Sequence, residues 1–344
     1  MSSSGADPRV VIDGRPLVGN RTGIGVHTAE IAGRLPFDPR PLIASHTPIE
    51  NRDGIEQCRF EVNRFPFGVA WQQFALPRIS GDVFWGPHGT LPVTLDKPAI
   101  VTLHDFTSIT MPGRHRLKTI LSFNLFIGRS LEIARRVAAV SRAIADEAIR
   151  SFAVPAQKIE IVPNGVDEFF SPGGAEGDAI LFVGTLEPRK GLNDLVAAWW
   201  SLPDRPRLIL CGDPGWRTRF DRPGIEVTGF VSKERLRELY RAARIFVYPS
   251  RYEGFGIPPL EAMACGAPVI ATRTGAIAEY AGDAAILVEP GNLGELRDTM
   301  LRLLRDRSLR DDLRLRGPAR ASRYRWEASA ATMADLLREA ARCA

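Results

Sequence analysis

The sequence predicts an α/β protein with two doubly wound domains, each built on a parallel sheet. Three observations lead to this prediction. The chain has 344 residues, which is long for one core and suits two domains. Short β-branched apolar runs alternate with amphipathic segments, the pattern of buried parallel strands between helices. A Pro/Gly-rich stretch, residues 169–178, interrupts this alternation and is the expected hinge.

The expected strands follow one another along both halves of the chain. In the first half they are Val10–Ile12, Ile100–Leu103, Val137–Val140 and Ile159–Val162. In the second half they are Ile180–Gly184, Leu208–Cys211, Ile225–Gly229, Ile245–Tyr248, Val269–Thr272 and Ile286–Val288. Apolar residues at helical spacing fill the intervals, as in Leu192, Leu195, Val196 and Trp199.

Composition is that of an ordinary globular protein, with 44% hydrophobic and 25% charged residues. No apolar run is long enough to span a bilayer and the first residues lack a signal-peptide pattern, so a cytoplasmic location is expected. The scattered cysteines predict free thiols: Cys58, Cys211, Cys265 and Cys343. The formal charge of +5 fits a phosphorylated ligand or an anionic membrane surface and does not demand nucleic acid.

The most informative motif is a glycine loop bracketed by two carboxylates, Glu253 and Glu261. Ile257 precedes Pro258 and is disfavoured in the helical region, so a helix is predicted to begin at about the two prolines. It is expected to end before Gly266, a residue type suited to the left-handed position after a helix.

The chemistry of this loop indicates a sugar nucleotide. Gly254 and Gly256 allow close approach of the backbone to a ligand, and the open helix end suits a phosphate. Carboxylates accept hydrogen bonds from hydroxyls but repel bare phosphate, so the ligand should carry both groups. The alternative is that Glu261 only complements the helix dipole and that Glu253 is a solvated loop acid.

Further motifs occur in order along nearly the whole chain. They are residues 22–26 (Thr-Gly-Ile-Gly-Val), 102–106 (Thr-Leu-His-Asp-Phe), 140–142, 162–167, 182–191, 249–256 and 324–326. With the glutamate pair, this ordered set resembles the retaining GT-B glycosyltransferases of family 4, also called group 1 glycosyltransferases. Residues 186–190 and 104–106 are similar to the subgroup rich in mannosyltransferases that build bacterial polysaccharides.

The resemblance implies the GT-B architecture, in which two Rossmann-like domains face a central cleft. Residues 1–167 would form the acceptor-side domain, and a final helix of about residues 327–344 would pack back on it. Residues 168–326 would form the domain that binds the nucleotide sugar.

The resemblance also implies roles in the second domain. Glu261 should hold the donor ribose, and Glu253 the transferred sugar, together with the backbone of Gly254, Phe255 and Gly256. Lys190 should neutralise the diphosphate as the leaving group departs. Arg189 is a weaker candidate, since many relatives place their phosphate arginine upstream, where this chain has Gly184 and Thr185. Which cation completes the clamp is left open.

In the first domain the resemblance points to His104, which with Glu253 and Lys190 completes the implied catalytic set. His104 should face the donor sugar, and its neighbour Asp105 has no assigned role. A histidine beside an aspartate at a strand end is also a common structural arrangement. Gly23 and Gly25 open a helix and should approach the diphosphate or the acceptor, although a turn that needs glycine explains them equally well.

The implied activity is metal-independent transfer of a sugar, with retention, from a nucleoside diphosphate to an acceptor hydroxyl. No cofactor and no metal are expected. GDP-mannose is the first donor expected and a UDP-linked sugar the second. The acceptor would be a glycan or a lipid-linked sugar, in bacterial polysaccharide synthesis. The two rivals are a sugar-nucleotide 2-epimerase of the same architecture and a catalytically silent binding protein.

Peripheral contact with an anionic inner membrane is a further expectation. The candidate is the helix that carries Leu117, Ile120, Leu121, Phe123 and Phe126, flanked by Arg114, Arg116 and Lys118. Such an apolar stripe more often belongs to the core.

Overall fold

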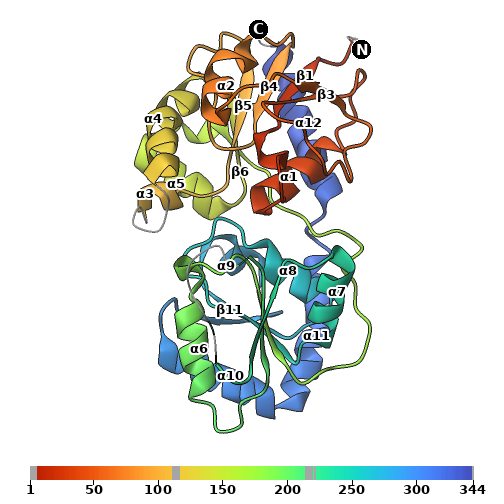
Figure 1. The fold of residues 1–344 in the computed structure, drawn as a ribbon, viewed down its shortest axis with the longest axis vertical. Helices are drawn as coiled ribbons and strands as arrows, with labels where there is room; N and C mark the ends of the chain where they lie inside the picture. The colour runs from red at the N-terminus through yellow and green to blue at the C-terminus, as the bar shows by residue number, and fades with distance from the viewer. Residues whose placement is uncertain (1–5, 111–116, 214–219, 221, 343–344) are drawn as a thin grey trace. The chain divides into compact units, whose positions relative to one another are not determined.

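The structure is a computed structural model, which describes residues 6–110, 117–213, 220 and 222–342. The chain divides into two compact units (Figure 1). Unit 1 comprises Met1–Gly165 and Trp326–Ala344, and unit 2 comprises Val166–Arg325. Each unit contains one parallel sheet covered by helices, so the predicted α/β class with two Rossmann-like domains is confirmed.

The sheet of unit 1 has seven strands in the described residues, all parallel, in the order β3-β2-β1-β4-β5-β6-β7. The strands are β1 (Val10–Asp13), β2 (Leu42–Ser45), β3 (Arg59–Val62), β4 (Val83–Gly86), β5 (Ala99–Leu103), β6 (Arg136–Ala139) and β7 (Ile159–Ile161). The strand order reverses between β1 and β4, and ligands of open α/β sheets bind at such a switch point, beyond the carboxyl ends of the strands.

Three strands of unit 1, β2, β3 and β4, were not predicted from the sequence. Each is four residues long, as is the predicted strand β1, so length does not explain why they were missed. In β3, Arg59 and Glu61 alternate with Phe60 and Val62, because this edge strand is partly exposed on both faces. A half-exposed edge strand does not show the continuous apolar pattern on which the prediction rests.

The helices of unit 1 are α1 (Gly23–Ala32), α2 (Gly68–Phe74), α3 (Thr107–Thr110), α4 (Leu117–Ile133), α5 (Arg142–Phe152) and α12 (Trp326–Arg342), with 3₁₀ turns η1 (Arg15–Leu17), η2 (Leu76–Arg78) and η4 (Ala156–Lys158). The final helix, α12, packs against α1 and against β4, β5 and β6. Its side chains Trp326, Met333 and Leu337 are buried in the core of unit 1. The last element of the chain therefore completes the first unit.

The sheet of unit 2 is also parallel, in the order β10-β9-β8-β11-β12-β13 over the described residues. Its strands are β8 (Ile180–Val183), β9 (Leu208–Cys211), β10 (Ile225–Gly229), β11 (Ile245–Tyr248), β12 (Val269–Thr272) and β13 (Ile286–Val288). Five of these have the predicted bounds, and β8 ends one residue earlier. The switch point of this sheet lies between β8 and β11.

The helices of unit 2 are α6 (Leu192–Trp200), α7 (Lys233–Ala242), α8 (Ile257–Ala264), α9 (Gly275–Tyr280), α10 (Leu293–Arg305) and α11 (Arg307–Ala321), with the 3₁₀ turn η5 (Pro188–Lys190). Polar side chains cap three of the helix starts, and Asp306 accepts a hydrogen bond from the Leu309 amide at α11. Ser232 accepts a hydrogen bond from the Arg235 amide at α7, and Asn292 accepts one from the Glu295 amide at α10.

The glutamate motif has the predicted loop-to-helix form, with one shift. Helix α8 begins at Ile257, one residue before the predicted start, because the restriction on a residue preceding proline is a preference that a first helical turn can override. The helix ends at Ala264, and Gly266 follows with a φ of 78°. The predicted stop is confirmed.

The predicted hinge at residues 169–178 is wrong, because this stretch packs inside unit 2. Phe170 is buried, and the Arg241 guanidinium donates to the Ser171 carbonyl oxygen at 2.7 Å. The chain passes between the units at Gly165–Val166 and at Arg325–Trp326. The aromatic residues that open the stretch anchor it to α7 and outweigh the flexibility of its glycines.

Cys58, Cys211 and Cys265 are buried free thiols, as predicted, and Cys343 lies outside the described residues. None of the described helices is both long and apolar enough to cross a membrane.

Candidate active site

The carboxyl ends of β8 and β11, at the switch point of unit 2, carry two predicted catalytic residues. Lys190 ends η5, which follows β8, and Glu253 lies in the loop after β11. Both side chains are buried, and Lys190 Nζ donates to Glu253 Oε1 at 2.6 Å. The structure therefore brings the predicted phosphate-binding cation and the predicted sugar-binding carboxylate into one ion pair.

Two glycines permit the close packing of these loops. Gly191 has a φ of 69°, and a Cβ atom there would overlap the carbonyl oxygen of Pro249, just past β11. Gly275 has a φ of 47°, and a Cβ atom there would overlap the carbonyl oxygen of Glu253. Because only glycine fits both the backbone angles and the space, these positions fix the loops that carry Lys190 and Glu253.

Arg189 adds a second cation to the cluster. Its Nη2 atom lies 2.7 Å from Glu187 Oε1, and its Nη1 atom lies 3.7 Å from Glu253 Oε1. The exposed fractions of the Arg189 and Glu187 side chains are 16% and 13%. The weaker of the two predicted cations is thus within reach of the same carboxylate as Lys190.

Burial and charge act in opposite directions on the pKa of Glu253. Burial alone would raise it, but Lys190 and then Arg189 hold the pKa of this carboxyl below its ordinary value. Burial lowers the pKa of Lys190, and the negative charge of Glu253 opposes that shift. Glu253 is therefore ionised at neutral pH, and its carboxylate favours the charged form of Lys190.

Tyr248, the last residue of β11, joins this ion pair and was missed by the sequence analysis. Its hydroxyl donates to Glu253 Oε1 at 3.0 Å and accepts from Lys190 Nζ at 2.9 Å. Burial and the Glu253 charge raise the pKa of Tyr248 well above its usual value, so the phenol keeps its proton. The available signal was a tyrosine ending an apolar strand five residues before the glutamate.

Glu261 lies on α8 and is held by a residue from another helix. Tyr240, which is fully buried on α7, donates its hydroxyl proton to Glu261 Oε2 at 2.9 Å. Glu261 itself is half-buried. Tyr240 belongs to the buried face of α7 with Leu239, but no sequence pattern links it to a residue 21 positions away.

Gly254, Phe255 and Gly256, whose backbone is predicted to hold the sugar, form the loop before α8. The Phe255 side chain is buried and packs against the rings of Tyr280 and Tyr324, with centroids 5.3 and 6.3 Å away. The Tyr280 hydroxyl donates to the Gly256 carbonyl oxygen at 2.7 Å. The side chain of Phe255 is therefore a core residue that supports the loop.

In unit 1, His104 directly follows β5. Its Nε2 atom donates to the carbonyl oxygen of Pro87 at 2.9 Å, which leaves Nδ1 as the accepting nitrogen. Its neighbour Asp105 accepts from the amide and the hydroxyl of Thr107, at 3.0 and 2.5 Å. Asp105 thus supports the start of α3, a structural role that the sequence analysis left open.

His27, on α1, contacts His104 and was also missed. Its ring is fully buried, 4.7 Å from the His104 ring and perpendicular to it. Its Nδ1 atom lies 2.6 Å from Asn164 Oδ1, and its ring contacts Trp326 with a centroid separation of 6.1 Å. Asn164 and Trp326 lie beside the two points where the chain leaves and re-enters unit 1.

The two glycines predicted to open a helix do so in α1 of the same unit. A Cβ atom on Gly25 would lie 2.5 Å from the carbonyl oxygen of Pro16, so packing requires glycine there. A Cβ atom on Gly23 would meet no atom within 4 Å. Packing thus explains Gly25 without a ligand, whereas Gly23 stays a candidate.

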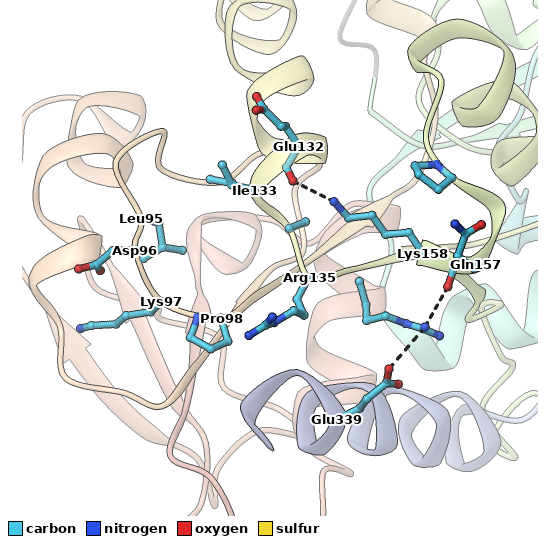
Figure 2. Close-up of a pocket in the computed structure, with 13 residues that line it drawn as sticks. Leu95, Asp96, Lys97, Pro98, Glu132, Ile133, Arg135, Gln157, Lys158 and Glu339 are labelled. Atoms are coloured by element: carbon cyan, nitrogen blue, oxygen red, sulfur yellow. Dashed lines mark hydrogen bonds and ion pairs between the residues drawn. The ribbon is translucent and has the colours of Figure 1, made fainter. Parts of the chain in front are cut away.

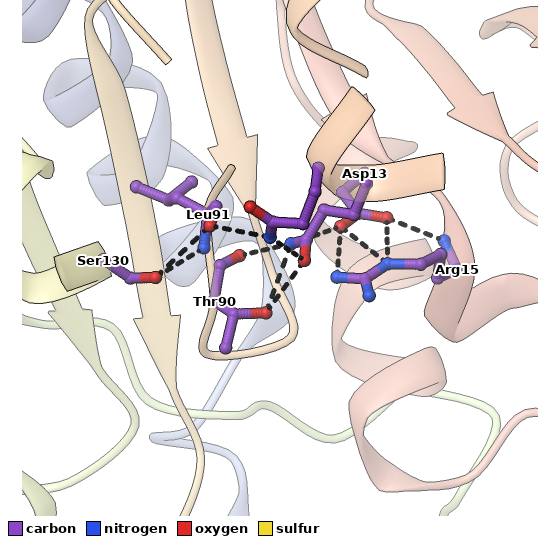
Figure 3. Close-up of polar contacts among 7 residues, drawn as sticks. Asp13, Arg15, Thr90, Leu91 and Ser130 are labelled. Carbon is purple, nitrogen blue, oxygen red and sulfur yellow. Dashed lines mark hydrogen bonds and ion pairs between the residues drawn. The ribbon is translucent and has the colours of Figure 1, made fainter. Parts of the chain in front are cut away.

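A buried polar network lies at the switch point of unit 1 (Figure 3). Asp13, at the end of β1, pairs with Arg15 through a contact of 2.6 Å between Oδ2 and Nη2. Gln72 of α2 donates to Asp13 Oδ2 at 3.1 Å and to the Thr90 carbonyl oxygen at 2.8 Å. The network ties the loops after β1 and β4 together, and the sequence analysis missed it.

A cavity of about 850 Å³ opens on unit 1 at the amino ends of the strands, opposite to the end where the Asp13–Arg15 pair lies (Figure 2). It adjoins the starts of β5 and β6, whereas ligands of such sheets bind at the carboxyl ends. Lys158 donates to the carbonyl oxygens of Leu131 and Glu132, and Arg136 Nη1 donates to that of Gln157. These cations serve the fold, so the cavity is distinct from the candidate active site.

Models of two glycosyltransferase families match the chain. A family model described as glycosyl transferases group 1 matches residues 177–306, and one described as glycosyltransferase family 4 matches residues 63–168. The chain belongs to this family of group 1 glycosyltransferases, and the predicted resemblance is confirmed.

Among curated proteins, the chain is similar to O-antigen chain mannosyltransferase B of Escherichia coli. The identity is 34% over 283 residues, which cover 74% of each chain. It is also 29% identical over 206 residues to the serotype-specific mannosyltransferase WbdA of Escherichia coli, a match that covers 56% of this chain and 24% of that protein.

Solved structures share the fold over almost the whole chain. Anabaena HepE in complex with UDP-glucose superposes with a TM-score of 0.78 at 20% identity, covering 96% of this chain and 99% of that one. WaaG, a glycosyltransferase involved in lipopolysaccharide biosynthesis, superposes with a TM-score of 0.75 at 17% identity, covering 95% and 99%. The prediction of two Rossmann-like domains that match GT-B glycosyltransferase structures is confirmed.

Proposed function

We propose that this glycosyltransferase moves mannose from GDP-mannose to a hydroxyl of a glycan or lipid-linked acceptor in bacterial polysaccharide synthesis. The observation that carries the proposal is the buried cluster of Lys190, Arg189 and Glu253 at the switch point of unit 2. Cations there suit a diphosphate, and a carboxylate suits sugar hydroxyls. Similarity to a protein named O-antigen chain mannosyltransferase B supports mannose and the polysaccharide context.

In this proposal each group has one task. Lys190 and Arg189 stabilise the charge that develops on the leaving diphosphate, so the protein's own cations fill the role that a metal ion has in other enzymes. Glu261, oriented by Tyr240, holds the ribose. The anomeric configuration is retained because the acceptor attacks from the face that the phosphate leaves, and the departing phosphate takes the acceptor proton.

Unit 1 supplies the acceptor side. His104 contacts the donor sugar, and the acceptor binds near the Asp13–Arg15 network at the switch point of that sheet. A UDP-linked sugar is the second donor candidate. A 2-epimerase is not favoured, since the similar curated proteins are named as transferases.

A donor screen by thermal shift tests the proposal. GDP-mannose should raise the melting temperature more than UDP-glucose or UDP-N-acetylglucosamine, because a ligand that binds only the folded state stabilises it. Glu261→Ala should weaken binding of the preferred nucleotide by about 1.5–3 kcal/mol in calorimetry, the size of a hydrogen bond to a charged group.

The matched control is Glu238→Ala, which removes an exposed carboxylate of the same unit that pairs with Arg235. It should leave nucleotide affinity unchanged. If Glu261→Ala binds the nucleotide with unaltered affinity, Glu261 does not contact the ribose. If only UDP-sugars raise the melting temperature, the donor is a UDP-sugar and not GDP-mannose.

We propose in addition that unit 1 contacts an anionic inner membrane. The sequence predicts that helix α4 makes this contact. Arg114 and Arg116, which flank that helix, lie outside the described residues. The segment around α2 is better suited: Phe67, the extended residue that precedes α2, and Phe74, the last residue of α2, are 71% and 62% exposed. Between residues 63 and 81 the only charged side chains are two arginines, which suits anionic lipid headgroups.

Vesicle sedimentation tests this contact. The double variant Phe67→Ser/Phe74→Ser should pellet less with phosphatidylglycerol vesicles than the unmodified protein. Leu315→Ser, which removes a 78% exposed leucine from α11 of unit 2, is the control and should change nothing. Equal sedimentation of the double variant would show that this surface does not bind the membrane.

A further inference from the structure

The candidate phosphate site of unit 2 contains as many carboxylates as cations. Arg189 pairs with Glu187 and Lys190 pairs with Glu253, at 2.7 and 2.6 Å. All four side chains are at most 16% exposed. An incoming diphosphate therefore meets a cluster without net charge, in which the cation that should attract it already has an anionic partner.

Glu253 cannot easily move away from this position. Its Oε1 atom accepts from both Lys190 Nζ and the Tyr248 hydroxyl, and these two donors also bond to each other. Tyr248 is buried at the end of β11, and its ring stacks on Phe182 of β8 with centroids 5.7 Å apart. The carboxylate is thus held by the sheet as well as by the lysine.

A fixed carboxylate beside the phosphate-binding lysine acts differently on donor and product. A nucleoside diphosphate ends in a free phosphate that carries about two negative charges at neutral pH, since its second pKa is about 6. That group is repelled by Glu253. In the intact donor the same phosphate carries a sugar and one charge less, and the sugar hydroxyls donate hydrogen bonds to the carboxylate.

We propose that Glu253, fixed by Lys190 and Tyr248, makes the site selective for the intact sugar nucleotide over the nucleoside diphosphate product, and so promotes product release. This inference rests on the proposed function, because it takes Lys190 to bind the diphosphate. It adds a discriminating role to Glu253, for which Tyr248 is a positioning residue.

The test compares two ligands on the same variants by calorimetry. Glu253→Gln keeps the size of the side chain and removes its charge. GDP should bind this variant about tenfold more tightly than the unmodified protein, a gain of about 1.4 kcal/mol. GDP-mannose should bind no more tightly, because the loss of a charged acceptor for sugar hydroxyls offsets the reduced repulsion. The affinity ratio of donor to product should therefore fall at least tenfold.

Two variants separate this effect from a general change of charge or of fold. Glu187→Gln removes one negative charge from the same cluster and should shift both affinities by the same factor. Tyr248→Phe retains Glu253 but releases one of its anchors, and it should lower the ratio of donor to product in the same direction by a smaller factor. Melting temperatures of the free variants confirm that each is folded.

The outcomes are distinct. Equal changes for GDP and GDP-mannose in Glu253→Gln, or weaker GDP binding, would overturn the inference and leave the proposed function intact. An unmodified protein that binds neither GDP, UDP nor their sugars would overturn the proposed function and with it the inference.

Discussion

Replacement of Lys190 by alanine is expected to lower the rate of sugar transfer by about 10²–10³-fold, the usual effect of removing one group that stabilises a developing negative charge. The variant loses the cation that we propose to stabilise the leaving group. It also leaves Glu253 buried without its 2.6 Å partner, so burial will raise the pKa of that carboxyl. Steady-state transfer from the preferred donor measures the loss.

A conservative variant and a control variant show whether that loss is specific to the ammonium group of Lys190. Lys190→Arg should restore only part of the rate, because a planar guanidinium does not reproduce the point charge of an ammonium group. Lys233→Ala is the control: this lysine of the same unit pairs with Asp167 and is 46% exposed. Full activity in Lys190→Ala would mean that another cation, with Arg189 as the first candidate, neutralises the diphosphate.

His104→Ala should separate transfer from nucleotide binding. The residues proposed for the nucleotide, Lys190 and Glu261, belong to unit 2, whereas His104 belongs to unit 1. Affinity for the nucleoside diphosphate should stay within about twofold, and the transfer rate should fall by at least about tenfold, the equivalent of a lost hydrogen bond. Both are measured on the same preparation.

His46→Ala, a second histidine of unit 1, controls for loss of stability. If His104→Ala loses affinity and rate together, the imidazole supports the fold; if its transfer rate is normal, it lies outside the site.

The pH dependence gives a second test of His104. Burial lowers its pKa to about 4, so the ring is neutral at pH 7 and stays so down to about pH 5. Because the unfolded state takes up the proton first, at its ordinary pKa near 6.5, stability is lost as the pH falls from there towards 4. His104→Asn should weaken this acid sensitivity, and the transfer rate should show no titration of His104 near pH 6.5.

Strands β8, β9 and β11 of unit 2 were predictable from sequence because each is a continuous apolar run that is buried on both faces. Strands β8 and β11, for example, are buried at every residue. The glutamate pair and Lys190 were proposed as site residues for a different reason: a ligand requires specific residue types at fixed spacing along one segment. Where the residues of a site lie close together in sequence, a motif is enough to select them as candidates.

The residues that hold this chemistry in place were not predictable, because their partners are distant in sequence. Tyr248 meets Lys190 across 58 positions and His27 meets Asn164 across 137. A tyrosine on a strand or a histidine on a helix looks like an ordinary core residue until the sheet order is known. Tertiary packing, which no local pattern encodes, selects these supporting side chains.

The packing of α12 on unit 1 has a consequence for the order in which the protein folds during synthesis. Unit 2 is one continuous segment and can fold as soon as residue 325 has left the ribosome. Unit 1 begins first but finishes last, because Trp326, Met333 and Leu337 fill its core only after the whole of unit 2 has been made. Until then the side chains of β4, β5 and β6 that α12 covers lack this cover, and exposed apolar surface of this kind favours aggregation of the nascent chain.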